Sequence, residues 1–116
     1  MKVAIATDGN NVSAHFGHCE GFFFYALDEN GNSQKSFTPN PGHRPGFLPM
    51  FLKENDINVI IAGGMGGAAQ SMFMDNDIEV FVGIQGDCDA AIQEYMSGRM
   101  KSSGSVCQDH QHEGSC

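Results

Sequence analysis

The chain has 116 residues, of which 41% are hydrophobic, and a formal net charge of −8 at pH 7 with only six Lys and Arg. This length suits one domain with a buried core. Nucleic acid and anionic membrane surfaces are excluded as expected partners, because binding either one needs clustered cations.

The apolar runs are too short to cross a bilayer, and the first residues lack the cleavage region of a signal peptide. We therefore expect a cytoplasmic protein. In that compartment the four cysteines should stay reduced, so metal chemistry is favoured over cross-linking.

The first half of the chain predicts three strands and a helix. Residues 2–7 are apolar on both faces, as in a buried central strand, and residues 21–27 form an aromatic strand. The Asn-Gly pair at positions 30–31 is a strong hairpin signal, so residues 33–38 should pair antiparallel with that strand. Apolar residues at helical spacing predict a helix from about 46 to 55.

The second half alternates strands and helices. Residues 58–62 predict a strand, and a glycine-rich turn then leads into a helix ending near Asp75. A strand is expected over residues 78–82, followed by a helix with Asp87 as its N-cap. Cys88 lies on the apolar stripe of that helix, where we interpret it as a core residue.

These elements predict an α/β fold with a five-strand mixed sheet, its second strand antiparallel, and helices on both faces. The predicted domain covers residues 1–100. From Lys101 the composition becomes polar, with a single branched aliphatic residue, so residues 101–116 are expected to form a disordered tail.

The residues with the richest metal-binding chemistry are His15, His18 and Cys19, separated by Phe16 and Gly17. Imidazole and thiolate are ligands that zinc, copper and the iron of sulfur clusters prefer. Gly17 allows the backbone to bend so that the donors share one ion. The alternative is a polar turn with a half-buried cysteine.

The predicted topology places this loop at the carboxyl edge of the sheet, where open α/β sheets bind ligands. His43 should lie on the same edge, as a further metal ligand or as a solvent-exposed histidine. Backbone N–H groups of the glycine-rich turn and the charge of Arg44 could hold an anion there. The turn consists of Gly63, Gly64, Met65, Gly66 and Gly67. A negatively charged metal cluster would suit this combination.

Four more donors lie in the tail, at Cys107, His110, His112 and Cys116. Their spacing is compatible with zinc or copper. Segments of this composition also scavenge metals without specificity, so the tail is the weaker candidate.

Four segments, in order, carry a resemblance to a known family: Val3-Ala4-Ile5-Ala6, His15-Phe16-Gly17 before the aromatic strand, Ile61 to Gly66 before a helix, and Tyr95-Met96-Ser97-Gly98. In these the chain resembles the dinitrogenase iron–molybdenum cofactor biosynthesis family, including NifX-like proteins and NifB carboxy-terminal domains. The resemblance implies a ribonuclease-H-like three-layer fold. It also implies binding or carriage of iron–molybdenum cofactor precursors or other molybdenum-containing metal–sulfur clusters. Cofactor-biosynthesis or acceptor proteins would then be partners.

Other functions compete with that of a cluster carrier. Gly64 to Ala69 matches G-x-G-x-x-A, but it follows an internal strand and lacks the ribose-binding acid, which argues against a nicotinamide enzyme. Asp8 ends a central strand without a matching second carboxylate, so we interpret it as a turn residue. A metal-dependent or Cys19-based enzyme and a metal-free interaction module stay as alternatives. We expect no enzyme, because no set of nucleophile, base and orienting group can be assembled.

Overall fold

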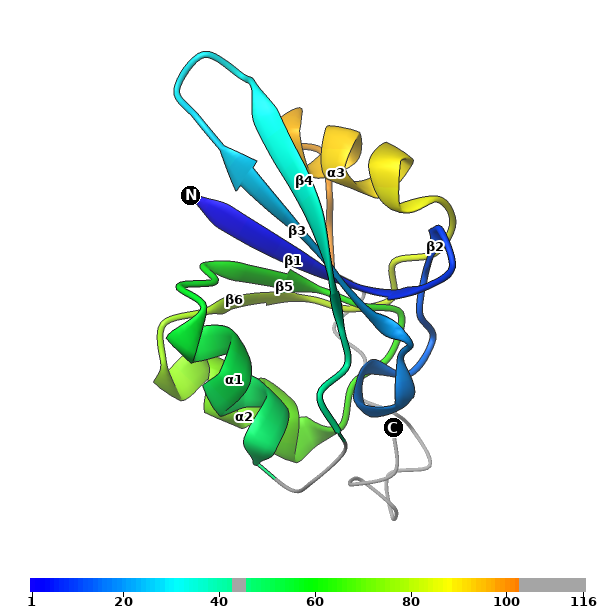
Figure 1. The fold of residues 1–116 in the computed structure, drawn as a ribbon, viewed down its shortest axis with the longest axis vertical. Coiled ribbons are helices and arrows are strands. Elements are labelled where there is room, and N and C mark those ends of the chain that lie inside the picture. The colour runs from blue at the N-terminus through cyan, green and yellow to red at the C-terminus, as the bar shows by residue number, and fades with distance from the viewer. Residues whose placement is uncertain (43–45, 103–116) are drawn as a thin grey trace.

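The computed structural model describes residues 1–42 and 46–102 (Figure 1). Its elements, in chain order, are β1 (Lys2–Asp8), β2 (Asn11–Val12), the 3-10 turn η1 (Phe16–His18), β3 (Gly21–Leu27), β4 (Ser33–Pro39), α1 (Phe47–Glu54), β5 (Val59–Ile61), α2 (Gly67–Asp75), β6 (Glu79–Phe81) and α3 (Cys88–Met96). The predicted strands and helices are all present, with ends that differ by at most two residues.

The sheet has the predicted mixed topology. Its strand order is β4-β3-β1-β5-β6, with β1 antiparallel to β3, β3 antiparallel to β4, and β1, β5 and β6 parallel. The predicted count of five strands is wrong, because in the described residues the sheet has six. The additional strand, β2, has only two residues and pairs with the end of β1, at Thr7↔Val12 and Asp8↔Asn11. A pattern this short carries no periodicity.

Apolar residues on both sides of the sheet explain why helices cover both faces. Alternate residues of β1 point to opposite sides: Ala4 and Ala6 pack with α1 and α2, and Val3 and Ile5 pack with α3. Figure 1 shows α1 and α2 together on one side and α3 on the other. The mixed sheet is therefore the middle of three layers.

The ends of the last helix follow its sequence. The Asp87 side chain accepts a hydrogen bond from the Ala90 amide at 3.0 Å, which confirms the predicted N-cap. Cys88 is 1% exposed and belongs to the core beside α3, as predicted.

Beyond α3 the described chain continues to Ser102. Met100 is buried, and the Ser102 hydroxyl accepts a hydrogen bond from the Val82 amide at 3.0 Å. Ordered contacts thus extend two residues into the segment that was expected to be tail. In the described residues no helix has the length and apolar character needed to cross a membrane.

Candidate functional site

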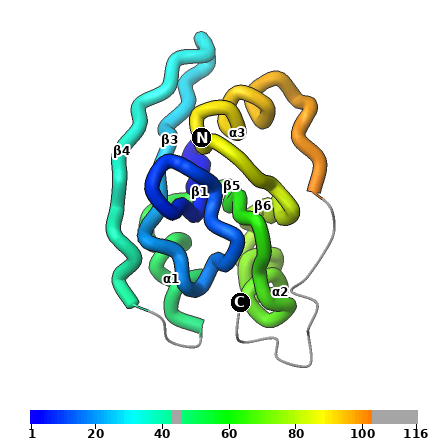
Figure 2. Tube along the Cα trace, turned by 90° about the vertical axis from the view of Figure 1, so that its right-hand side faces the viewer, coloured from blue at the N-terminus to red at the C-terminus, as the bar shows by residue number. Residues whose placement is uncertain are grey.

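The loops that follow β1, β4, β5 and β6 lie at the carboxyl edge of the sheet, as the topology requires. Figure 2 looks onto this edge, with the segment between β1 and β3 in front. Backbone hydrogen bonds join this segment to the turn after β5: Gly63 donates to the Ser13 carbonyl at 2.8 Å, and Phe16 donates to the Gly64 carbonyl at 3.0 Å. The histidine-containing loop and the glycine-rich turn are therefore neighbours.

Gly63 is the residue that permits this close approach. A Cβ atom at that position would lie 2.8 Å from the Ser13 carbonyl oxygen and 2.9 Å from the Ala14 Cα. Both are backbone atoms that cannot rotate away. The Gly63 carbonyl also accepts a hydrogen bond from Gly83 at 2.9 Å, which links the turn to the segment after β6. Three neighbouring segments of the edge thus meet at one glycine.

The 3-10 turn η1 sets the orientation of the two histidines. The Phe16 ring is buried 5.4 Å from the Phe73 ring and 5.8 Å from the Phe22 ring, and it anchors the turn in the core beside α2. The His18 amide donates to the His15 carbonyl at 3.1 Å, so the histidines lie one turn apart. Both histidines are exposed. Two imidazole-bearing residues therefore flank a fixed aromatic anchor at the edge.

Cys19 lies in a different environment. It is 4% exposed and belongs to the core cluster beneath α1 and α2. Burial and the neighbouring charge of Asp8 raise the pKa of the Cys19 thiol to about 12. In this conformation the group is a protonated thiol at neutral pH, and hence a poor nucleophile and an unprepared metal ligand.

Asn40 holds Cys19 in this position, and sequence reasoning did not identify it. Its side-chain amide donates to the Cys19 carbonyl at 2.9 Å and to the Gly17 carbonyl at 3.4 Å, and lies 3.8 Å from the Cys19 sulfur. Its side-chain oxygen accepts from the Gly42 amide at 2.9 Å. The available signal was the Pro-Asn-Pro sequence, in which asparagine commonly forms such a turn.

The three predicted ligands that the structure describes, His15, His18 and Cys19, do not form a preassembled metal centre. Among residues 1–42 and 46–102, no group of three or more His, Cys, Asp and Glu is placed to hold a metal ion. His15 and His18 face outward while Cys19 faces the core, so their roles as ligands stay predictions. The predictions for His43, Arg44 and the tail donors Cys107, His110, His112 and Cys116 concern positions outside the described residues.

The electrostatics of the edge differ along its length. Helix α1 begins after Gly46 and helix α2 begins after Gly66, and a glycine has no side chain that could cap a helix. Neither helix has an acidic residue in its first turn. In contrast, α3 begins with the Asp87 cap and has Asp89 in its first turn. First-turn amides attract anions. An anion would therefore favour the side of the edge where α1 and α2 begin.

Asp8 and Glu20 are engaged within the loop itself. The Glu20 amide donates to the Asp8 carboxylate at 2.9 Å, and the Gly9 amide donates to the Glu20 carboxylate at 3.0 Å. These bonds are consistent with the turn role expected for Asp8.

The chain is similar in sequence to known proteins. A family model described as dinitrogenase iron–molybdenum cofactor matches residues 1–98. The uncharacterized protein MJ0580 of Methanocaldococcus jannaschii is 28% identical over 106 residues, which cover 87% of this chain and 90% of that protein.

Two solved structures have a similar fold. The crystal structure of PH0822 has a TM-score of 0.81 at 27% identity. The match covers 90% of this chain and 98% of the PH0822 chain. The apo form of the orange protein from Desulfovibrio gigas has a TM-score of 0.73 at 17% identity. The match covers 90% of this chain and 93% of the orange protein chain. At that identity the second similarity concerns the fold alone.

Proposed function

The chain belongs to the dinitrogenase iron–molybdenum cofactor family, and on that premise we propose that it binds and carries a molybdenum-containing metal–sulfur cluster as cargo. The cargo is the iron–molybdenum cofactor, a precursor of it or a related cluster, held at the carboxyl edge of the sheet. The proposal includes a ribonuclease-H-like classification of the fold, a cytoplasmic location, and cofactor-biosynthesis or acceptor proteins as partners.

The observation that carries the proposal is the position of the two exposed histidines beside the glycine-rich turn that precedes α2. His15 and His18 lie one turn apart on a loop that Phe16 anchors against Phe73 of α2. Imidazole nitrogen is a good ligand for iron and copper, so two such groups can hold a cluster by its metals. The anchor keeps the histidines near the turn formed by residues 63–67.

The charge distribution favours one side of the edge for an anionic cluster. A metal–sulfur cluster with net negative charge would be repelled by Asp87 and Asp89 at α3. The first turns of α1 and α2 as described hold no such carboxylates, and their amide dipoles would attract the sulfido ligands. The protein can thus be acidic overall and still accept an anion.

Cys19 has a conditional part in this proposal. Its thiol is protonated and buried in the described conformation, so it becomes a ligand only when the Asn40 contacts open. Metal binding then drives the loss of its proton. The protonated state of Cys19 also speaks against a Cys19-based enzyme, and we propose a carrier rather than a catalyst.

Anaerobic loading with ferrous iron and tetrathiomolybdate, the simplest molybdenum–sulfur anion, tests the proposal. After desalting, molybdenum retained per chain is measured by mass spectrometry and visible absorption. The double variant His15→Ala/His18→Ala should retain at least about fivefold less molybdenum than the parent chain. The matched control, His110→Ala/His112→Ala, removes two histidines from the tail and should retain as much as the parent.

The reverse pattern, loss in the tail variant and retention in the edge variant, would place the binding site in the tail. A deletion of residues 103–116 gives an independent check, because it keeps the Met100 and Ser102 contacts and should leave loading unchanged.

A further inference from the structure

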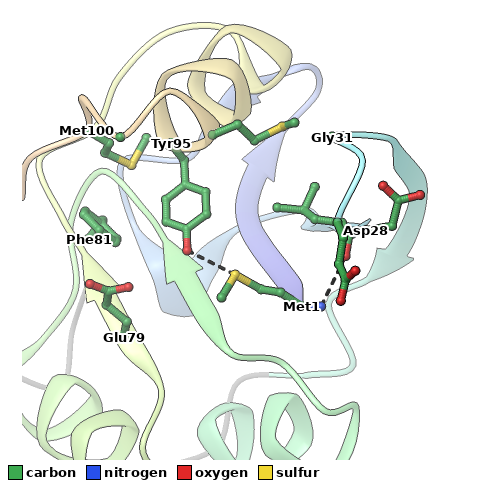
Figure 3. Close-up of a pocket in the computed structure, with 11 residues that line it drawn as sticks. Met1, Asp28, Gly31, Glu79, Phe81, Tyr95 and Met100 are labelled. Atoms are coloured by element: carbon green, nitrogen blue, oxygen red, sulfur yellow. Dashed lines mark hydrogen bonds between the residues drawn. The ribbon is translucent and has the colours of Figure 1, made fainter.

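The opposite, amino edge of the sheet is hollowed. A cavity of about 750 Å³ opens there between the start of β1, the hairpin after β3, the start of β6 and the end of α3. Figure 3 shows Tyr95 pointing from α3 toward Met1, with Phe81 and Glu79 on one side and Asp28 on the other. This volume is within the usual range for small-molecule sites.

The inner surface of the cavity is apolar and aromatic. The rings of Phe81 and Tyr95 meet edge to face, with centroids 5.7 Å apart and an interplanar angle of 80°. The Tyr95 hydroxyl donates to the Met1 sulfur at 3.2 Å, and Met100 is buried beside these rings. The faces of such rings carry negative potential, which attracts cations.

The rim of the cavity is acidic. Asp28, Glu29 and Glu79 line it and are exposed, while none of the described lining residues has a basic side chain. One positive group is present, the Met1 ammonium, which donates to the Leu27 carbonyl at 3.2 Å. Among the lining residues that the structure describes, carboxylates therefore outnumber positive charges by three to one.

The pKa shifts of two lining residues accord with an acidic rim. Hydrogen bonds from the Asn32 and Asn30 amides, both 2.9 Å long, lower the pKa of Asp28 and keep it ionised. Burial raises the pKa of Tyr95, and the charge of Glu79 raises it further.

An apolar, aromatic cavity with carboxylates at its mouth matches one class of small ligand. We propose that this cavity binds a small organic cation, with an aromatic or aliphatic body against Tyr95 and Phe81 and its ammonium group facing Glu79, while Asp28 adds negative charge on the other side of the mouth. An anionic ligand would meet the carboxylates, and a neutral one would gain nothing from them. The inference is independent of the proposed cluster site, since the two sites share no residue.

A titration with three molecules of similar shape tests the charge requirement. Amide NMR spectra are recorded with 2-phenylethylamine, 2-phenylethanol and phenylacetate, which are cationic, neutral and anionic at pH 7. The amine should shift the signals of residues around Glu79, Tyr95 and Asp28, with an affinity at least about tenfold higher than that of the alcohol. Phenylacetate should bind more weakly still. Equal affinity for amine and alcohol, or amine-induced shifts confined to the carboxyl edge, would overturn the proposal.

Variants then identify the groups responsible. Glu79→Gln should weaken 2-phenylethylamine binding by about three- to tenfold and leave 2-phenylethanol binding unchanged. Glu54→Gln, which removes the same charge from an exposed position on α1 that does not line the cavity, is the matched control and should leave both affinities unchanged. Tyr95→Phe keeps the ring and should stay within about twofold of the parent chain. Equal losses in Glu79→Gln and Glu54→Gln would show a general charge effect and contradict the site.

Discussion

The two ends of the sheet are built differently. At the carboxyl edge, backbone hydrogen bonds at Gly63 join the segments after β1, β5 and β6, and two histidines project from an anchored turn. At the amino edge, the ends of elements distant in sequence leave a cavity of about 750 Å³ with an acidic rim. Backbone hydrogen bonds between neighbouring segments hold the carboxyl edge together, whereas side chains shape the cavity at the amino edge. Substitutions should therefore affect the two ends in different ways.

The largest effect is expected from Phe16→Ala. The Phe16 ring is 2% exposed and touches Phe22 and Phe73, so its loss should lower the free energy of unfolding by about 3–5 kcal/mol. Phe37→Ala is the control, because Phe37 is 45% exposed on the edge strand and should cost much less. Urea unfolding followed by circular dichroism measures both. Similar losses would mean that Phe16 does not anchor the carboxyl edge.

Gly63→Ala should have the next largest effect, about 2–3 kcal/mol, because the new Cβ would collide with the backbone of Ser13 and Ala14. Gly9→Ala is the control that separates this collision from backbone strain. Gly9 has a φ of +63° but open space around it, so strain alone should lower the free energy of unfolding by about 1 kcal/mol. The same urea measurement applies. A Gly63→Ala chain as stable as Gly9→Ala would refute the close contact.

Asn40→Ala should lower the free energy of unfolding by about 1 kcal/mol, since it removes the hydrogen bond to the Cys19 carbonyl. It should also increase the rate at which iodoacetamide labels Cys19, as followed by site-resolved mass spectrometry. Asn32→Ala in the hairpin changes the same residue type at a distance from Cys19. It should leave that rate unchanged, and an equal increase would contradict the role of Asn40.

Ionisation of the Cys19 thiol should leave the free energy of unfolding unchanged at neutral pH and lower it in alkali. The pKa of the thiol rises from 9.0 to about 12 on folding. Its contribution to the free energy of unfolding is therefore fully present below pH 9 and is lost as the pH rises toward 12. Unfolding free energies of the parent chain should fall over this range more steeply than those of Cys19→Ala. Parallel pH profiles for the two chains would contradict the raised pKa.

Labelling at pH 8 tests the same group kinetically. A rise in pKa from 9.0 to about 12 reduces the thiolate fraction by about a thousandfold, so native Cys19 should react far more slowly than Cys19 in urea. Equal rates would show that the thiol is already open to solvent.

Much of the fold could be predicted because its signals are local. The two-faced apolar pattern of β1, the Asn-Gly turn before β4 and the Asp87 cap each lie within a few residues of the element that they specify. The two-residue strand β2 escaped prediction because two residues carry no periodicity and because, besides its pairing with β1, it has a partner far along the chain: Val12 donates to the Gly86 carbonyl at 2.8 Å.

The candidate site was only partly predictable for the same reason. Strand direction was enough to bring the loop after β1 and the turn after β5 to one edge. The burial of Cys19 instead depends on Asn40, 21 residues away, and on packing beneath α1 and α2. The amino-edge cavity could not be foreseen, because Met1, Glu79 and Tyr95 come together only in the folded chain.

The central claim is that the carboxyl edge, at the side where α2 begins, receives the metal–sulfur cargo. Its most direct test is an anaerobic amide NMR titration of the full chain with tetrathiomolybdate. The largest shifts should fall on residues 15–18 and 64–68, with the amino-edge residues around Tyr95 unchanged. Shifts confined to residues 107–116 would contradict the claim and assign the metal chemistry to the tail.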